Sequence, residues 1–287
     1  MSSLTIRHPW LDATLYPFQT HAFPTAAGSM AYVDEGSGPP VLLLHGTPSW
    51  SFEWRQVILD LRTTHRVIAP DLLGFGLSDR PTEGLGLLDH VQRLRAFVEA
   101  LDLRDLTLVV HDFGGPIGLP LALDTPRVAR LIVINSWMWP SEGDRTIARI
   151  DRFVRSALGR FLYRRLSFSA RVLLPAAFGD RKRLTRAVRR HYLAPLSGSA
   201  RAREGTYALA CALRGGDDHY ARLWAARDRL ARLPMSLVWG EKDPLLTAQH
   251  RDRWIEAFPH ARVVRVADAG HFVAEERPDA VVEAVRA

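Results

Sequence analysis

The sequence predicts an α/β protein in which a mostly parallel, doubly wound sheet is interrupted once by an inserted helical cap. Over the first 137 residues, short and almost continuous apolar runs alternate with helical patterns. The strand signal disappears over residues 138–229 and returns near the carboxyl end. Strands that alternate with helices are typical of βαβ units and of a parallel sheet. A chain of 287 residues is long enough for one large domain with such an insertion.

Seven segments have the composition of strands. Four of them contain the runs VLLL, RVIA, TLVV and LIVI, which are typical of strands buried on both faces of a parallel sheet. In chain order, the predicted strands are Met30–Glu35, Val41–His45, Arg66–Asp71, Leu106–His111, Leu131–Asn135, Met235–Gly240 and Arg262–Ala267.

Helical patterns fill the intervals between these strands. The clearest is Leu88–Leu101, whose apolar residues recur on one face at a 3.6-residue period. The others are Phe52–Leu61, Arg145–Leu158, Lys182–Arg190, Ala248–Phe258 and Pro278–Val285. We therefore expect the first part of the core at residues 1–137, a helical cap at 138–229 and the second part of the core at 230–287. The cap would be inserted after the fifth predicted strand.

The composition excludes several protein classes. With 47% hydrophobic and 24% charged residues, the chain is an ordinary globular protein rather than a disordered one. Its one cysteine, Cys211, excludes an intramolecular disulfide framework and a cysteine-built metal site. No apolar run approaches the length that spans a bilayer, and the first residues lack the apolar region of a secretory signal. We expect a soluble, cytoplasmic protein with no membrane partner, no metal and no cofactor.

The net charge of +7 is concentrated in the predicted cap. Residues 141–233 hold 21 basic and eight acidic residues, whereas the rest of the chain holds 17 basic and 23 acidic residues. We interpret this basic segment as a solvated helical surface, and a patch for anionic partners is the alternative. It lacks the interleaved aromatic residues expected of a single-strand nucleic-acid site, so we expect no nucleic-acid partner.

The segment VVHDFGGP, residues 109–116, carries the first chemical signal. It joins the end of a buried strand to the start of a helix, which is the strand–turn–helix context of a nucleophile elbow. The nucleophile position is Asp112, and Gly114 and Gly115 leave room for the sharp turn. A carboxylate nucleophile is suited to displacement at sp³ carbon, which forms an ester that water must later cleave. A simple helix-capping role for Asp112 is the alternative.

The segment LLLHGTPSW, residues 42–50, also follows a predicted strand end. A turn at His-Gly would direct the backbone N–H of Thr47 toward the elbow, beside the N–H of Phe113. Two such donors form an oxyanion hole for the tetrahedral intermediate of ester hydrolysis. A purely structural turn is the alternative interpretation.

The segments SLVWGEKDP and DAGHF supply an acid and a histidine. Asp243 and His271 each follow a predicted strand end, and the order nucleophile, acid, histidine along the chain is that of the α/β-hydrolases. His271 would activate water, while Asp243 would hold its tautomer and stabilise the imidazolium. The rival acid would follow the fifth strand, but the chain reads Asn135-Ser136-Trp137 there. The nearest carboxylate is Glu142, so Asp243 is preferred.

Six segments together resemble the haloalkane dehalogenases of the α/β-hydrolase superfamily: HGTPSWSFEWR, PDLLGFGLSDRP, VVHDFGGP, INSWMWP, VWGEKDP and DAGHF. The similarity spans residues 30–140 and 235–285, and the cap is similar only in length and helical character. The resemblance implies the α/β-hydrolase fold and a small apolar substrate that reacts with water. It also implies that Asp112 is the nucleophile, His271 the base and Asp243 the acid.

The chain departs from this family where the halide is held. Family members usually carry Trp directly after the nucleophile and Asn or another polar residue after His-Gly, and these positions are Phe113 and Thr47 here. Losing a donor directed at the departing halide would cost about 10²–10³ in rate. We therefore expect an atypical halide site, with Trp137, Trp139 and Asn135 as candidates for leaving-group or pocket contacts.

Other functions remain open on the sequence alone. An epoxide hydrolase has the same triad, but it needs cap tyrosines that protonate the epoxide oxygen. The candidates are Tyr163, Tyr192, Tyr207 and Tyr220. A different hydrolytic activity and a non-catalytic ligand-binding protein on the same scaffold are further alternatives, and the sequence leaves the oligomeric state and the natural substrate open.

Overall fold

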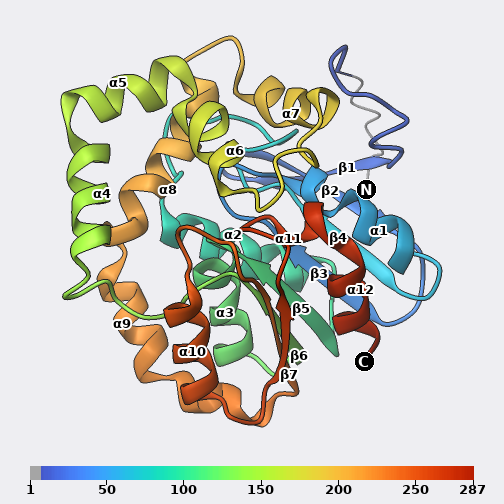
Figure 1. Ribbon diagram of the computed structural model, residues 1–287. Coiled ribbons are helices and arrows are strands. Elements are labelled where there is room, and N and C mark those ends of the chain that lie inside the picture. Colours follow the sequence, from blue (N-terminus) through green and yellow to red (C-terminus); the bar gives the residue numbers. More distant parts are fainter. Residues whose placement is uncertain (1–7) are drawn as a thin grey trace.

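The computed structural model describes residues 8–287, which form one eight-stranded sheet covered by helices (Figure 1). From one edge to the other, the strands are β1 (Thr20–Thr25), β2 (Gly28–Glu35), β4 (Arg66–Pro70), β3 (Pro40–Leu44), β5 (Leu106–His111), β6 (Val128–Ile134), β7 (Met235–Gly240) and β8 (Arg262–Val266). Strand β2 is antiparallel to both of its neighbours, and all other neighbouring pairs are parallel. The predicted mostly parallel sheet is therefore confirmed.

Seven strands lie where the sequence predicts them, with ends shifted by at most three residues. The eighth, β1, was not predicted. It pairs with β2 through a two-residue turn between Thr25 and Gly28. Its sequence, THAFPT, has only a short apolar stretch. It also contains Pro24, which a strand tolerates at the edge of a sheet.

Side chains alternate between the two faces of the sheet, and each face has its own apolar core. On one face, Leu42, Leu108 and Val133 pack with residues of three helices, α2 (Leu87–Ala100), α3 (Gly114–Asp124) and α10 (Ala248–Ala257). On the other, Val41 and Val109 pack with α1 (Arg55–Leu61) and α12 (Pro278–Arg286). Burial on both faces explains the nearly continuous apolar runs of the central strands.

Two short elements complete the core near the sheet. They are the 3₁₀ turn η1 (Ser51–Trp54), which precedes α1, and the helix α11 (Val273–Glu276), which precedes α12. Each comes directly after a segment of predicted chemistry, since η1 follows LLLHGTPSW and α11 follows DAGHF.

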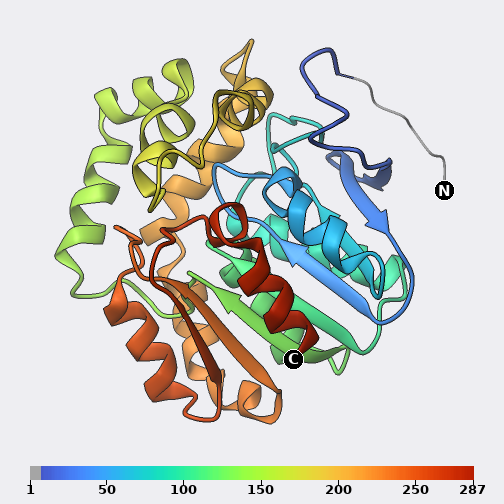
Figure 2. The same cartoon turned by 45° about the vertical axis from the view of Figure 1, so that its right-hand side comes forward.

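The described chain between β6 and β7 is helical and contributes no strand to the sheet. Its elements are α4 (Arg145–Arg155), α5 (Ala157–Leu166), the π-helical turn η2 (Ser169–Leu173), α6 (Leu174–Ala177), α7 (Arg186–Leu193), α8 (Glu204–Gly215), α9 (Asp217–Ala225) and the 3₁₀ turns η3 (Ala194–Leu196), η4 (Arg201–Arg203) and η5 (Arg227–Arg232). Both views show α4 and α5 at the outer edge of the molecule (Figures 1 and 2). These helices occupy the place expected for the cap, and the division at residues 137 and 230 stays a prediction.

Two helices of this region differ from their predicted bounds because capping residues interrupt the pattern. The predicted helix Arg145–Leu158 ends at Arg155, since the Ser156 side chain accepts a hydrogen bond from the backbone N–H of Gly159 and starts α5. Similarly, Thr185 caps α7 by accepting from the N–H of Val188, so that helix begins at Arg186. Among residues 8–287, no helix is both long and apolar enough to cross a membrane.

Candidate active site

Asp112 lies on a strained turn between β5 and α3. Its φ of +50° is in the left-handed region, which Asp adopts more readily than most residues but still at a cost. The turn is held by the backbone on both sides, because the N–H of Asp112 bonds the carbonyl of Asn135 and its own carbonyl accepts from Gly115 N–H and Ser136 Oγ. Strain that is held in this way is common at functional sites.

Two glycines make this turn fit against β3. A side chain at Gly46 would collide with the Asp112 carboxylate, and one at Gly114 would collide with the backbone carbonyl of Leu44. The backbone after β3 can therefore approach the carboxylate closely. The N–H of Thr47 donates to Asp112 Oδ1 at 2.8 Å, which places the first predicted oxyanion-hole donor against the elbow.

The second carboxylate oxygen of Asp112 faces His271. Asp112 Oδ2 lies 3.5 Å from His271 Nε2, and the other ring nitrogen, Nδ1, lies 2.7 Å from Asp243 Oδ2. All three side chains are buried, although Asp112 remains 8% exposed to solvent. The structure thus brings together the nucleophile, histidine and acid predicted from three distant parts of the chain.

Asp243 is fixed by four hydrogen bonds. Its Oδ1 accepts from the backbone N–H groups of Leu245 and Leu246 at 2.8 and 3.0 Å. Its Oδ2 accepts from His271 Nδ1 and, at 2.7 Å, from Nδ2 of Asn135. A carboxylate held by so many donors stays ionised and can orient an imidazole strictly.

The charges of this cluster shift two pKa values in opposite directions. Burial alone would lower the pKa of His271, but the carboxylates of Asp243 and Asp112 outweigh it and raise that pKa to about 10. Burial alone would raise the pKa of Asp243, but the His271 charge and the hydrogen bonds lower it to about 2. The imidazole is therefore held as a cation between two carboxylates at neutral pH.

Asn135 has a different place from the one expected. Its amide is fully buried, donates to Asp243 and to the carbonyl of Gly240, and accepts from the N–H of Gly240 at 2.8 Å. Both ends of the side chain are thus used inside the fold rather than at a leaving group. The rival acid, Glu142, is exposed and has no part in the cluster around His271.

The three aromatic candidates fall into two groups. Phe113 lies directly after the nucleophile, and its ring meets that of Trp137 edge-on, with centroids 4.9 Å apart. Trp139 instead packs against Trp224 and Trp254, with the guanidinium of Arg253 over its ring. Trp137 is therefore beside the elbow, whereas Trp139 belongs to an aromatic cluster between α9 and α10.

A buried polar pair behind His271 was missed by sequence reasoning. His111 Nε2 donates to the backbone carbonyl of His271 at 2.9 Å, and His111 Nδ1 lies 3.2 Å from Glu53 Oε1. The rings of His111 and His271 are in contact, with centroids 4.6 Å apart. The available signal was the place of His111, directly before Asp112, and of Glu53, a carboxylate between the aromatic residues Phe52 and Trp54.

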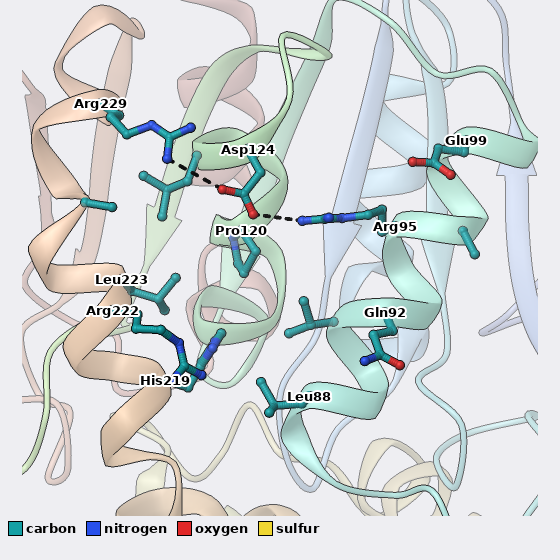
Figure 3. A pocket seen from close by; sticks show the side chains of 14 residues that line it. Leu88, Gln92, Arg95, Glu99, Pro120, Asp124, His219, Arg222, Leu223 and Arg229 are labelled. Atoms are coloured by element: carbon teal, nitrogen blue, oxygen red, sulfur yellow. Dashed lines mark hydrogen bonds and ion pairs between the residues drawn. The ribbon is translucent and has the colours of Figure 1, made fainter.

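A cavity of about 580 Å³ lies elsewhere on the molecule, between α2, α3 and the α9–η5 segment (Figure 3). Its rim includes Asp124, which bonds Arg95 at 2.8 Å and faces Arg229 at 3.7 Å. None of the predicted site residues lines it. This cavity is therefore separate from the triad.

Comparison with known proteins identifies the family of this chain. Residues 39–278 match the family described as alpha/beta hydrolase fold. Haloalkane dehalogenase 2 of Mycobacterium tuberculosis is 35% identical over 96% of both chains. The chain belongs to the haloalkane dehalogenase-like α/β-hydrolases. It is a hydrolase of this family, and the resemblance noted in its motifs is confirmed.

Two further proteins similar to this haloalkane dehalogenase-like chain give different information, one about the reaction and one about the fold. A cis-3-alkyl-4-alkyloxetan-2-one decarboxylase of Shewanella oneidensis is 31% identical over 95% of this chain and 89% of its own length. The crystal structure of haloalkane dehalogenase DbeA from Bradyrhizobium elkani superposes with a TM-score of 0.84, over 93% of this chain and 96% of that one, at 24% identity. The first relative has a different named reaction, and the second supports the fold.

Proposed function

We propose that this protein cleaves carbon–halogen bonds through an alkyl ester on Asp112. The observation that carries the proposal is the position of the Asp112 carboxylate, with one oxygen on the N–H of Thr47 and the other facing His271. The 35% identity to a haloalkane dehalogenase supports carbon–halide bonds as the target.

In the first step, a carboxylate oxygen of Asp112 attacks the sp³ carbon that carries the halogen. The carbon–oxygen bond forms as the carbon–halogen bond breaks, and halide leaves with the bonding electrons. The Asp112 side chain is held by a backbone donor on a rigid turn, so the attacking oxygen is oriented before the substrate arrives.

In the second step, His271 removes a proton from water, which attacks the ester carbonyl of Asp112. The tetrahedral oxyanion is stabilised by the N–H of Thr47 and, by its place at the start of α3, by that of Phe113. When this intermediate collapses, the bond between the carbonyl carbon and the alkyl oxygen breaks. The alcohol leaves with a proton returned by His271, and the Asp112 carboxylate is restored. Esterification removes one of the two carboxylate charges that raise the pKa of His271. The imidazole therefore becomes a base at the stage where a base is required.

The halide site is the unusual part of this proposal. The side chain of Phe113 has no N–H or O–H to offer, so the side-chain donors left nearby are the indole of its neighbour Trp137 and the hydroxyl of Thr47. That hydroxyl is buried and has no hydrogen-bond partner among the described residues. A halide that meets fewer directed donors leaves more slowly, and the rate then follows leaving-group ability.

Opening of an oxetan-2-one is a second candidate, favoured by the Shewanella relative together with the weak halide site. Asp112 would attack the sp³ ring carbon that is bonded to the ring oxygen. The bond between that carbon and the oxygen would break, and the carboxylate formed would stay attached through the rest of the former ring. Loss of carbon dioxide would then supply the electrons of an alkene as the bond to Asp112 breaks. This sequence consumes no water, so it does not require His271 as a base.

The epoxide hydrolase alternative is not favoured. The hydroxyl of Tyr192 donates to Glu275, and that of Tyr220 donates to the carbonyl of Ala212 at 2.8 Å. Two of the four candidate tyrosines therefore use their protons within the fold.

The test is to trap the ester. His271→Gln removes the base but not the nucleophile, so incubation with 1-bromohexane should add one hexyl group to the intact mass. Asp112→Asn with His271→Gln should show no adduct. An unmodified single variant, alongside wild-type enzyme that releases bromide, would rule out the ester mechanism.

Product analysis distinguishes the two candidates. Wild-type enzyme should convert 1-bromohexane to bromide and hexanol, and a 3,4-dialkyl oxetan-2-one to carbon dioxide and an alkene if the second candidate holds. Decarboxylation that persists in His271→Gln, without halide release by the wild type, would replace the first proposal by the second.

A further inference from the structure

Exposed apolar side chains are concentrated on one part of the helical insertion. Among residues 8–287, seven large hydrophobic side chains are exposed, and five of them lie within residues 158–173. These five are Leu158, Phe161, Leu166, Val172 and Leu173. Single exposed apolar residues are normal on a protein surface, but a cluster of this kind marks an interaction site.

Two exposed apolar residues of α5 share one side of that helix, and a third lies at its carboxyl end. Leu158 and Phe161 are three residues apart and project from neighbouring positions, whereas Leu166 is the last residue of α5 and lies about 140° from Phe161 around the axis. They are 61%, 53% and 48% exposed. The opposite side of α5 is packed, because Tyr163 is buried and contacts the ring of Phe168. The helix is therefore anchored by one side while it presents apolar side chains on the other.

We call the exposed side chains of residues 157–173 the α5 face. The chain around it is strongly basic, since residues 157–190 hold ten basic residues and one acidic residue, Asp180. Arg160, Arg165 and Arg171 are exposed within the α5 face itself. Both views place α5 at the outer edge of the molecule, where a large partner can reach it (Figures 1 and 2).

We propose that the α5 face binds an anionic lipid surface. Aliphatic and phenyl side chains at such a surface insert at the boundary between headgroups and acyl chains, while arginines bind the lipid phosphates. Residues 157–173 combine both features, since exposed apolar side chains and exposed arginines occur in the same segment. The contact is peripheral, and it would bring the enzyme to the place where apolar substrates accumulate.

Charge argues against the other partners of an apolar face. In a symmetric pair formed through the α5 face, two strongly basic segments would meet, which opposes association. A nucleic acid would satisfy the arginines but would leave the exposed leucine and valine side chains without a partner. A lipid surface satisfies the charges and the apolar side chains together.

A lipid-binding α5 face replaces the solvated surface without a membrane partner that we expected from the sequence. Neither charge nor the absence of a spanning segment reveals which side of an amphipathic helix stays unpacked. The alternative of a patch for anionic partners is the one that the exposed apolar side chains favour.

Sedimentation with lipid vesicles tests the proposal. We expect the intact chain to sediment with vesicles of phosphatidylglycerol and phosphatidylcholine but not with phosphatidylcholine alone. Salt should weaken this binding without abolishing it, because apolar insertion is not screened. Leu158→Ser with Phe161→Ser should weaken it roughly tenfold or more. The control is Leu88→Ser on α2, a similarly exposed leucine outside the α5 face, which should bind like the wild type.

Three results would overturn the proposal. One is wild-type protein that does not bind anionic vesicles, and another is a double variant that binds as well as the Leu88→Ser control. The third is a dimer, seen by light scattering without lipid, that the double variant abolishes. Thermal melting verifies that every variant is folded. Because sedimentation measures binding and not catalysis, the result does not depend on whether the enzyme releases halide.

Discussion

The loops at the strand ends bury polar groups, whereas the inserted helices expose apolar side chains. At the ends of β5, β7 and β8, polar groups are buried and nearly all hydrogen-bonded, and Asp243 alone accepts four bonds. On the insertion, apolar side chains such as Phe161 are exposed among arginines. Our two proposals therefore assign the chemistry to the core and contact with an anionic lipid surface to the insertion. Variants in the two regions should affect different measurements.

The largest effect is expected at the nucleophile. Asp112→Ala should lower turnover of a bromoalkane by about 10⁴–10⁶, because no other group can form the ester. Halide release measures this effect, and vesicle binding should be unchanged. Activity that stays within tenfold of the wild type would show that the chemistry lies outside the core cluster.

The next effect concerns the acid. Asp243→Asn should lower turnover by about 10³–10⁴, since an amide favours the wrong tautomer of His271. The matched control is Glu142→Gln, which changes an exposed carboxylate and should leave halide release unaltered. If the control loses activity and Asp243→Asn keeps it, the acid has been assigned wrongly.

A gain of activity is expected from repair of the halide site. Phe113→Trp with Thr47→Asn should raise bromide release by roughly tenfold or more, because two side-chain N–H donors are then directed at one ion. The double variant should exceed the product of the single variants, since the donors position the same ion. Wild-type turnover near 1–10 s⁻¹ would instead show that a donor such as Trp137 already holds the halide.

The pKa of His271 should respond to its two carboxylates. In Asp112→Asn one negative charge disappears, so we expect an imidazole pKa below the wild-type value of about 10. NMR titration of the ring measures this directly. For stability the sign follows from a raised folded-state pKa: the contribution is present below the ordinary value of 6.5 and is lost as pH rises through about 10. The wild type should therefore lose more stability than Asp112→Asn over that interval.

The smallest effect is expected on the insertion surface. Leu158→Ala should change the free energy of unfolding by less than about 0.5 kcal/mol, because the side chain is exposed. Leu42→Ala, in the buried strand β3, should cost about 2–5 kcal/mol. Urea denaturation of both variants measures the contrast. A large loss in Leu158→Ala would mean that the α5 face is packed in solution.

The sequence was most informative where burial is two-sided. Strands such as β5 and β7 could be predicted because short, continuous apolar runs are typical of a strand covered on both faces, whereas β1 is an edge strand with a proline and has no such signature. The proximity of Asp112, His271 and Asp243 could be predicted because each follows a predicted strand end. The role of Asn135 could not, since its partner Asp243 is 108 residues away and only the fold brings them together. A helical pattern likewise does not reveal which side of α5 remains unpacked.

The pair formed by His111 and Glu53 links three loops of the site through one side chain. The backbone carbonyl of His271 can only accept a hydrogen bond, so Nε2 of His111 is the donor. The other ring nitrogen, Nδ1, lies 3.2 Å from Oε1 of Glu53, which belongs to the turn η1 after β3. A single imidazole at the end of β5 therefore joins the segment after β3 to the loop that carries His271. Loosening this joint would move the histidine without touching either aspartate that brackets its ring.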